Sequence, residues 1–412
     1  MKISLNSVIE KVIWGLLVFL LTSFLTLGLT IGGRYLFLAA TLLIIPLSAL
    51  ANNGILRIRL HPYHFFLLFF ATYTALSSLW GLRSSDAIGK ASTLFQILAC
   101  VSVLFIHYDK TVNPRPLYLA IMWSGYFVTI YAILVYGMDT LLASAQDVRV
   151  GNEFNNINSV AMTAAISCMF QWNELLNKRS IWSTVFVIPA VILITATQSR
   201  KAFVMLFAGI VLLYVVKTMG QKGFAKKLLK LLAYFVVLIV AMTLLFRLPI
   251  FSGSLERMGQ LLNFWSNEGK VDHSTIERNE MMELGFRYWK ENPLFGVGIG
   301  CPHILSAAHL NRDAYLHNNF IELLCGGGIV GFVLFYSMYV YLAYSIFKYR
   351  NADPETAYLL LTWLALLLVM DYGSVSYYTK TRWYYLAIIF ISLDYLRRKH
   401  REMISNAEES AA

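Results

Sequence analysis

Charged residues are scarce in this sequence. Of its 412 residues, 14% are Asp, Glu, Lys or Arg, whereas 58% are hydrophobic. An ordinary soluble domain carries about a quarter of its residues as charged side chains. The deficit therefore excludes a typical water-soluble protein, and the charges that remain lie in short clusters between long apolar runs.

Patterns that bind metals or form disulfides are also absent from the sequence. The four cysteines, Cys100, Cys168, Cys301 and Cys325, have no CxxC spacing, so we expect buried thiols rather than a disulfide framework or a zinc site. No HExxH, DxD or paired-carboxylate signature is present, which argues against metal-dependent hydrolysis and against a metal-bound sugar nucleotide. We therefore predict neither a metal nor a cofactor.

The sequence lacks a recognisable cleavable signal peptide, because its first apolar run is too long and has no small-residue cleavage site. It also lacks an obvious internal repeat, which weakens an inverted-repeat transporter interpretation. The net charge of +11 does not point to nucleic acid, because cytoplasmic loops of membrane proteins are enriched in Lys and Arg. Membrane lipids are the predicted partners, and nucleic acid is not.

What the sequence does contain is a series of apolar runs close to the length that crosses a bilayer as a helix, about 20 residues. Backbone facing lipid must satisfy its own hydrogen bonds, so such runs are helices. The sequence therefore predicts an all-α polytopic membrane protein of about twelve transmembrane helices. The runs fall at residues 12–31, 35–51, 64–82, 91–107, 117–137, 159–176, 181–197, 202–216, 231–247, 319–347, 357–373 and 383–396.

The distribution of Lys and Arg in the short loops places both termini in the cytoplasm. Residues 1–247 then hold nine spans, residues 248–318 form one large extracytoplasmic loop, and residues 319–396 hold three more spans before a basic cytoplasmic tail at 397–412. The basic segment Lys217–Lys230 suits a helix lying on the anionic inner leaflet, with specific lipid recognition as the alternative.

The large loop shows helical patterning at 254–265 and again at 275–293. We expect the second helix to be capped by Ser274 or Thr275 and to stop at Pro293, where the glycine-rich turn PLFGVGIG begins. Loops of this length are usually functional.

Three arginines on the predicted outer side are candidates for anion binding. Arg200 lies between two apolar runs, where a guanidinium either sits at the headgroup level or binds a phosphate in bidentate geometry. Arg278 and Arg287 lie on the predicted loop helix, where the simpler interpretation is a solvated helix face.

His317 lies where the loop meets a long apolar helix, followed by Asn318 and, further on, by Gly328 and Gly331. A histidine here can cap the helix or carry chemistry, and small residues in transmembrane helices also permit close packing. Glu322 lies just inside the span, where an acid needs a partner such as His317 or an Arg.

These residues resemble the hallmark of the O-antigen ligase and polymerase superfamily, membrane glycosyltransferases of the type-C fold. That hallmark is His, then Asn, Ser or Gln, nine residues of any type, Gly, two more, and Gly, Thr or Tyr. His317-Asn318, the nine residues 319–327, Gly328 and Gly331 satisfy it in full.

Other motifs of the family are matched in order. Its Arg after a transmembrane Ser or Thr is similar to Ser199-Arg200, and its loop Arg before a Pro-Leu-Phe-Gly turn is similar to Arg278. An Arg-x-Gly pattern followed by Asn-rich sequence begins at Arg149. The resemblance covers most of residues 145–335.

The resemblance implies a metal-independent, inverting glycosyltransferase at the outer face of the bacterial inner membrane. Its donor would be a glycan on undecaprenyl diphosphate and its acceptor a glycan or lipid. A polymerase is slightly preferred over a ligase, and a lipid-linked-sugar transporter or flippase is the alternative. The implied roles are catalysis for His317, Arg200 and Arg278, substrate binding for Arg149, Arg287, Asn318 and Glu322, and motif structure for Gly328 and Gly331.

Overall fold

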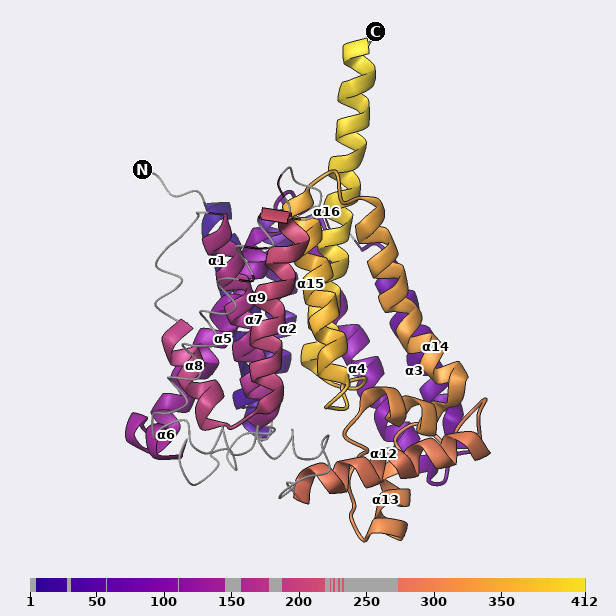
Figure 1. Ribbon diagram of the computed structural model, residues 1–412. Coiled ribbons are helices and arrows are strands. Elements are labelled where there is room, and N and C mark those ends of the chain that lie inside the picture. Colours follow the sequence, from indigo (N-terminus) through magenta and orange to yellow (C-terminus); the bar gives the residue numbers. More distant parts are fainter. Residues whose placement is uncertain are drawn as a thin grey trace.

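The computed structural model describes residues 5–27, 31–56, 58–109, 111–144, 157–177, 187–218 and 273–411, together with residues 223, 225–226, 229 and 232. Within these ranges the regular secondary structure is helical, and most of the helices run roughly parallel to one another as a bundle (Figure 1). The helices are α1 (Leu5–Thr26), α2 (Ile31–Ala51), α3 (Pro62–Leu76), η1 (Ser77–Leu79), α4 (Ser84–Tyr108), α5 (Arg115–Tyr136), α6 (Met138–Ser144), α7 (Ile157–Leu176), α8 (Val187–Ala196), α9 (Arg200–Thr218), α12 (His273–Glu291), α13 (Pro302–Leu310), α14 (Asn319–Lys348), α15 (Pro354–Asp371) and α16 (Lys380–Ala411).

Six of these helices, α1, α4, α5, α9, α14 and α15, are long and apolar enough to cross a membrane. Shorter apolar helices run over Tyr35–Ala51 and Val187–Ala196. The prediction of an all-helical polytopic membrane protein agrees with this architecture. Eleven of the twelve predicted runs coincide with described helices, whereas the run at 231–247 lies outside the described residues except at position 232. A total of twelve spans stays a prediction.

A continuous hydrophobic core joins the helices of the bundle. α1 packs against α2 and α5, α5 against α7, α7 against α9, and α9 against α15, while α3 packs against α4 and α14. The segment of α16 from Trp383 to Leu393 is buried on every side. A helix that is apolar all round belongs in the interior, which explains why α16 occupies the middle of the bundle.

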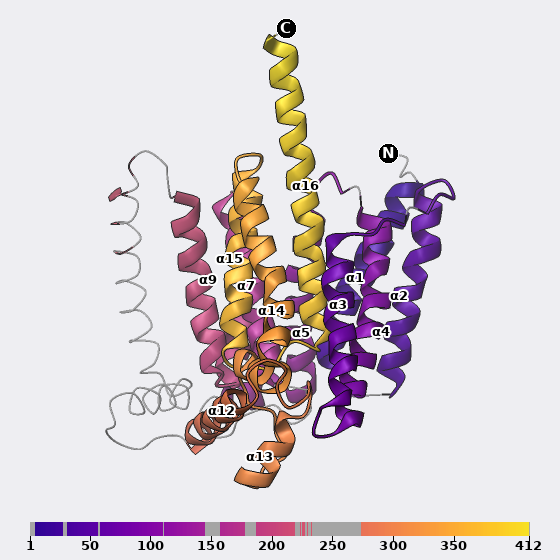
Figure 2. The ribbon, with the colours of Figure 1, turned by 90° about the vertical axis from the view of Figure 1, so that its right-hand side faces the viewer.

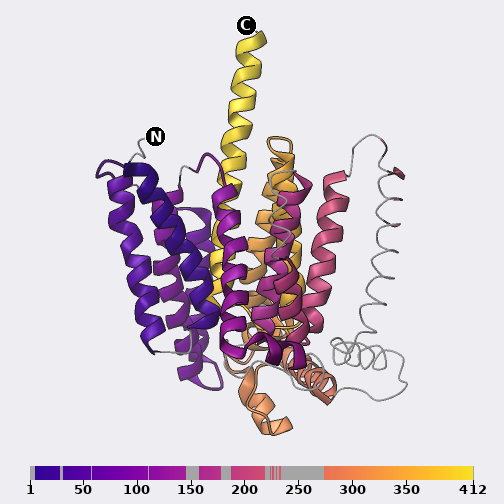
Figure 3. The ribbon, with the colours of Figure 1, turned by 90° about the vertical axis from the view of Figure 1, so that its left-hand side faces the viewer.

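The remaining helices lie at one end of the bundle, which we call the loop end. α12 runs across this end and α13 lies beyond it (Figures 1 to 3). The start of α1 and the end of α16 lie at the opposite end (Figure 1). Residues 397–411, predicted as a basic tail, continue α16 as a helix that projects past its neighbours.

A small core of its own fixes α12 and α13 to the bundle. It contains Met281 and Leu284 from α12, Leu305 from α13, and Cys325 from α14. All four cysteines are free; Cys168, Cys301 and Cys325 are buried as expected, whereas Cys100 is only partly buried. The loop end is therefore a packed structure and not a loose connection between spans.

Some predicted boundaries were wrong. α12 begins at His273, so Ser274 and Thr275 lie inside its first turn and not at its cap. α4 begins at Ser84, seven residues before the predicted apolar run, because polar side chains such as Asp86 and Lys90 shorten the run without ending the helix. The helical pattern at 254–265 and most of the basic segment 217–230 fall outside the described residues.

The structure explains why glycine stands at both glycine positions of the histidine motif. Gly328 interrupts α14 with a φ of 61°, a left-handed backbone that glycine adopts most readily. At this break, the N–H of Ile329 donates to the carbonyl of Pro293 at 2.8 Å. Just before it, the N–H of Val297 donates to the carbonyl of Cys325 at 2.9 Å. Gly331 leaves room for the ring of Tyr73. The break thus docks the predicted PLFGVGIG turn onto α14.

Replacing Gly328 by Ala should destabilise the protein by about 2 kcal/mol or more, because the left-handed backbone disfavours a Cβ and that atom would overlap the backbone of Leu294. The unfolding temperature in detergent, followed by intrinsic fluorescence, measures the loss. Gly89→Ala in α4 is the control, since nothing lies within 4 Å of its added Cβ. Equal unfolding temperatures for the two variants would contradict the proposed role of Gly328.

Candidate functional site

His317 lies in the connection between α13 and α14, residues 311–318, which we call the His317 loop. Its φ of 56° is in the left-handed region, which is uncommon for a residue with a side chain and marks a position held by its surroundings. On one side, Asn318 caps α14, because its Oδ1 accepts hydrogen bonds from the N–H groups of Phe320 at 2.9 Å and Ile321 at 3.1 Å. The helix cap therefore fixes the backbone immediately after the histidine.

On the other side of His317, the backbone is held by Glu322. This buried carboxylate accepts a 2.8 Å hydrogen bond from the N–H of Leu316. An acid inside a span needs a partner, and here the partner is the main chain of the loop and not the imidazole itself. Glu322 and Asn318, both predicted to bind substrate, thus hold the loop backbone on either side of His317.

Further contacts tie the His317 loop to neighbouring helices. His303 of α13 pairs through Nδ1 with Asp313 of the loop at 2.5 Å and through Nε2 with Asp86 of α4 at 3.0 Å. Burial lowers the pKa of His303, but its hydrogen bonds to Asp313 and Asp86 outweigh that effect and raise it. Arg312 forms an ion pair with Glu277 of α12. The loop is therefore fastened to three helices.

The imidazole of His317 is half-buried and packs against the ring of Tyr315, with ring centroids 4.4 Å apart. Its pKa is lowered to about 4 by burial and by the positive charges of Arg278, Lys201 and Arg312. The side chain is therefore neutral near pH 7, and a neutral imidazole can accept a proton. Three cations lie close enough to act on one base.

Arg200 and Arg278 come from different helices that meet at the loop end. Arg200 begins α9, and its guanidinium donates a 3.0 Å hydrogen bond to Oγ1 of Thr275 in the first turn of α12. Arg278 follows Thr275 by three residues, so the two residues lie on the same side of α12. The structure thus brings Arg200, Arg278 and His317 to the same end of the bundle.

Two predicted residues are not part of this group. Arg287 is exposed and follows Arg278 by nine residues, which places it about 13 Å further along α12 and on the opposite face. Arg149 lies outside the described residues. Substrate binding by Arg287 and Arg149 stays a prediction. Within the part of the chain that the structure describes, no three His, Cys, Asp or Glu side chains are grouped to hold a metal ion.

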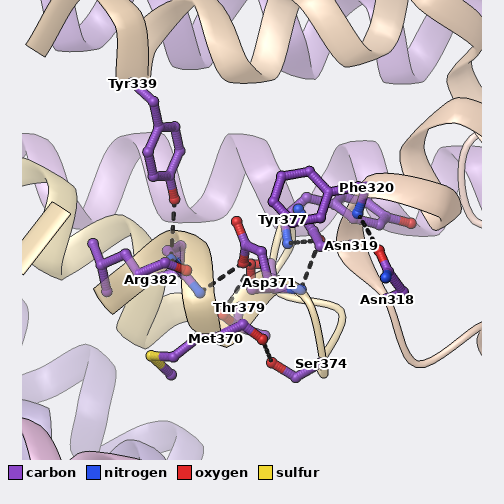
Figure 4. Close-up of polar contacts among 12 residues, drawn as sticks. Asn318, Asn319, Phe320, Tyr339, Met370, Asp371, Ser374, Tyr377, Thr379 and Arg382 are labelled. Carbon is purple, nitrogen blue, oxygen red and sulfur yellow. Dashed lines mark hydrogen bonds and ion pairs between the residues drawn. The ribbon is translucent and has the colours of Figure 1, made fainter. Parts of the chain in front are cut away.

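Sequence reasoning missed a buried polar network below the His317 loop (Figure 4). Asn319, the first residue of α14, donates to the hydroxyl of Tyr336 at 2.9 Å. That hydroxyl donates to Asp371 at 3.1 Å, and Asp371 forms a 2.7 Å ion pair with Arg382. The Oδ1 of Asn319 accepts from the N–H of Ser376 at 2.8 Å. The network ties the start of α14 to the loop between α15 and α16.

The only sequence signal for this network was the presence of charges at the ends of apolar runs. Asp371 and Arg382 are eleven residues apart, in two different helices, and both side chains are almost completely buried. A buried acid and a buried base inside a membrane protein imply a partner for each. The sequence does not say which of many charged residues they pair with.

Comparison with known proteins identifies a family whose matched region contains the candidate site. Residues 184–336 match the family model of the O-antigen ligases. The match includes Arg200, Arg278, the His317 loop and both motif glycines, and it confirms the resemblance inferred from the motifs. Residues 184–336 are thus similar to the O-antigen ligases, and this similarity supports glycan transfer in cell-envelope assembly. No curated protein matches the chain.

Replacing Arg382 by Met should destabilise the protein by about 3–5 kcal/mol, because it leaves the carboxylate of Asp371 buried without its cation. The unfolding temperature in detergent tests this. The double variant Asp371→Leu/Arg382→Met removes both charges and should recover much of the loss. A single variant as stable as the wild type would show that the ion pair does not hold the helices together.

Proposed function

We propose that the protein is a metal-independent, inverting glycosyltransferase. It transfers a glycan from undecaprenyl diphosphate to a sugar hydroxyl at the outer face of the bacterial inner membrane. The observation that carries the proposal is the location of His317 at the end of the bundle where Arg200 meets α12, with its pKa lowered by burial and by three cations. A base beside an anion-binding group is what this displacement requires. The family match supports glycan transfer.

In the proposed reaction, the acceptor hydroxyl attacks the anomeric carbon of the donor sugar. Its oxygen forms the new glycosidic bond while the bond from that carbon to the diphosphate breaks on the opposite face. The imidazole of His317 takes the hydroxyl proton, and the electron pair of the broken bond leaves on the diphosphate. Arg200 and Arg278 stabilise the charge that develops there, since guanidinium groups bind phosphate oxygens in bidentate geometry.

The proposed orientation puts the loop end outside and both termini in the cytoplasm. It is supported by the basic residues of the short connecting segments and by the location of α1's start and α16's end on the same side of the bundle. The glycan chemistry then takes place where lipid-linked repeat units are available. We propose polymerase activity, with the growing chain transferred onto another lipid-linked unit, ahead of ligation to a different acceptor.

Purified protein in nanodiscs, supplied with undecaprenyl-diphosphate-linked repeat units, should produce a ladder of glycan lengths on a gel, also in the presence of EDTA. His317→Ala should lower the rate by about 100-fold or more, because the base is lost. His309→Ala is the matched control: His309 lies at the end of α13, where it pairs with Tyr288. Its removal should leave the ladder intact.

The outcomes separate the candidate functions. A ladder from donor alone supports a polymerase, whereas product formed only after adding lipid A–core supports a ligase. Near-normal transfer by His317→Ala would disprove the base role. Translocation of the lipid-linked donor across the membrane without any transfer would favour a transporter.

The pH dependence of transfer should show the lowered pKa of His317. Burial and the charges of Arg278, Lys201 and Arg312 lower this pKa from 6.5 to about 4, so the basic form is present above that pH. We expect kcat/KM to be unaffected by His317 from pH 5 to 7 and to fall only as the pH drops toward 4. A fall centred near pH 6.5 would show that the cations do not act on the base in the free enzyme.

A further inference from the structure

Lys201 lies next to Arg200 at the start of α9, and it is a cation without a role in the family motifs. Its ammonium donates a hydrogen bond to the carbonyl of Gly373, in the loop between α15 and α16. Its aliphatic stem passes directly over that glycine, so that a Cβ at position 373 would overlap the end of the lysine side chain. The absence of a side chain at Gly373 therefore allows Lys201 to lie where it does.

The backbone that receives Lys201 is the same backbone that supports the His317 loop. Three and four residues after Gly373, the N–H groups of Ser376 and Tyr377 donate to Oδ1 of Asn319 at 2.8 and 3.1 Å. Asn319 follows His317 by two residues. Lys201 and the start of α14 are thus both attached to one short segment, residues 373–377, and Lys201 is among the charges that act on His317.

The charged groups that act on the pKa of His317 are all positive. The charged groups that act on its pKa are Arg278 from α12, Lys201 from α9 and Arg312 from its own loop, and all three are cations. Arg312 already pairs with Glu277. The nearest acid of α14, Glu322, is bonded to the main chain of Leu316. An anion that binds near these cations gains a favourable electrostatic interaction with each of them.

We propose that Lys201 is a third cationic ligand of the donor's diphosphate, beside Arg200 and Arg278, and that Gly373 keeps its ammonium in place. The inference rests on the proposed function, because it takes the diphosphate from that reaction. A diphosphate diester carries two negative charges and gains a third when its bond to the sugar breaks. A lysine ammonium acts as a point charge and can follow that additional charge, whereas the arginines fix the geometry.

Inorganic diphosphate is the probe, and its binding to purified protein in nanodiscs is measured by isothermal titration calorimetry. Lys201→Gln should weaken binding about tenfold or more, the usual effect of removing one charge-assisted hydrogen bond. Lys201→Arg should retain most of the affinity. Lys290→Gln is the matched control, because Lys290 lies at the loop end on α12 with its ammonium over the Phe286 ring. Its affinity should equal that of the wild type.

Gly373→Ala provides a second, independent test. Its φ is not in the left-handed region, so alanine fits the backbone, and the three atoms nearest to the added methyl group belong to the flexible end of Lys201. The variant keeps every charge but displaces the ammonium, and it should weaken diphosphate binding in the same direction as Lys201→Gln. It should also unfold at nearly the wild-type temperature.

A readout that a purely structural role would not change is the titration of His317, followed by NMR in the absence of donor. Removing the charge in Lys201→Gln should raise the pKa of His317 toward 6.5, whereas Lys290→Gln should not change it. Diphosphate affinity within twofold of wild type for both Lys201→Gln and Gly373→Ala would overturn the proposal, even if glycan transfer is observed. Lys201-dependent diphosphate binding without transfer from any donor would instead remove the proposed function and leave the anion site.

Discussion

The pairing of a broken transmembrane helix with the turn in front of it is the constraint on which the site depends. Gly328 interrupts α14. Around this break, the carbonyl of Pro293 accepts a hydrogen bond from the N–H of Ile329, and the N–H of Val297 donates one to the carbonyl of Cys325. Free N–H and carbonyl groups are costly at membrane depth, so the break and the turn stabilise each other. The turn then sets where α12 ends and α13 begins. The break thus acts together with the small core and the ion pairs of the His317 loop to position α12 over the bundle.

Much of this arrangement could be predicted from the sequence. Apolar length gave the helical bundle, because lipid leaves the backbone no alternative to internal hydrogen bonds. The spacing of His317, Gly328 and Gly331 identified the end of α14 that carries the candidate site, and the match at residues 184–336 confirmed the resemblance to the O-antigen ligases. The two arginines at positions 200 and 278 were selected by motif, and the structure brings Arg200 to α12 through Thr275.

What sequence reasoning missed are the contacts between segments distant in the chain. Asp371, Arg382 and Asn319 are ordinary polar residues in a linear reading, and only the folded chain shows that they form one network. Glu322 was expected to pair with His317 or an Arg, because an acid in a span needs a partner, yet its hydrogen bond is to a backbone N–H six residues earlier. A main-chain partner cannot be read from side-chain identity. Periodicity likewise identifies helix α12 but not which of its arginines faces the histidine.

The lowered pKa of His317 has a consequence for the proposed reaction, because it links the basicity of the imidazole to the charge of what is bound beside it. Cations lower the proton affinity of a nearby base, so His317 is a weaker base while no anion is bound among them. A bound anion offsets those cations, and the proton affinity of the imidazole rises with it. In the proposed transfer, His317 is therefore a stronger base with the anionic donor bound than in the empty site.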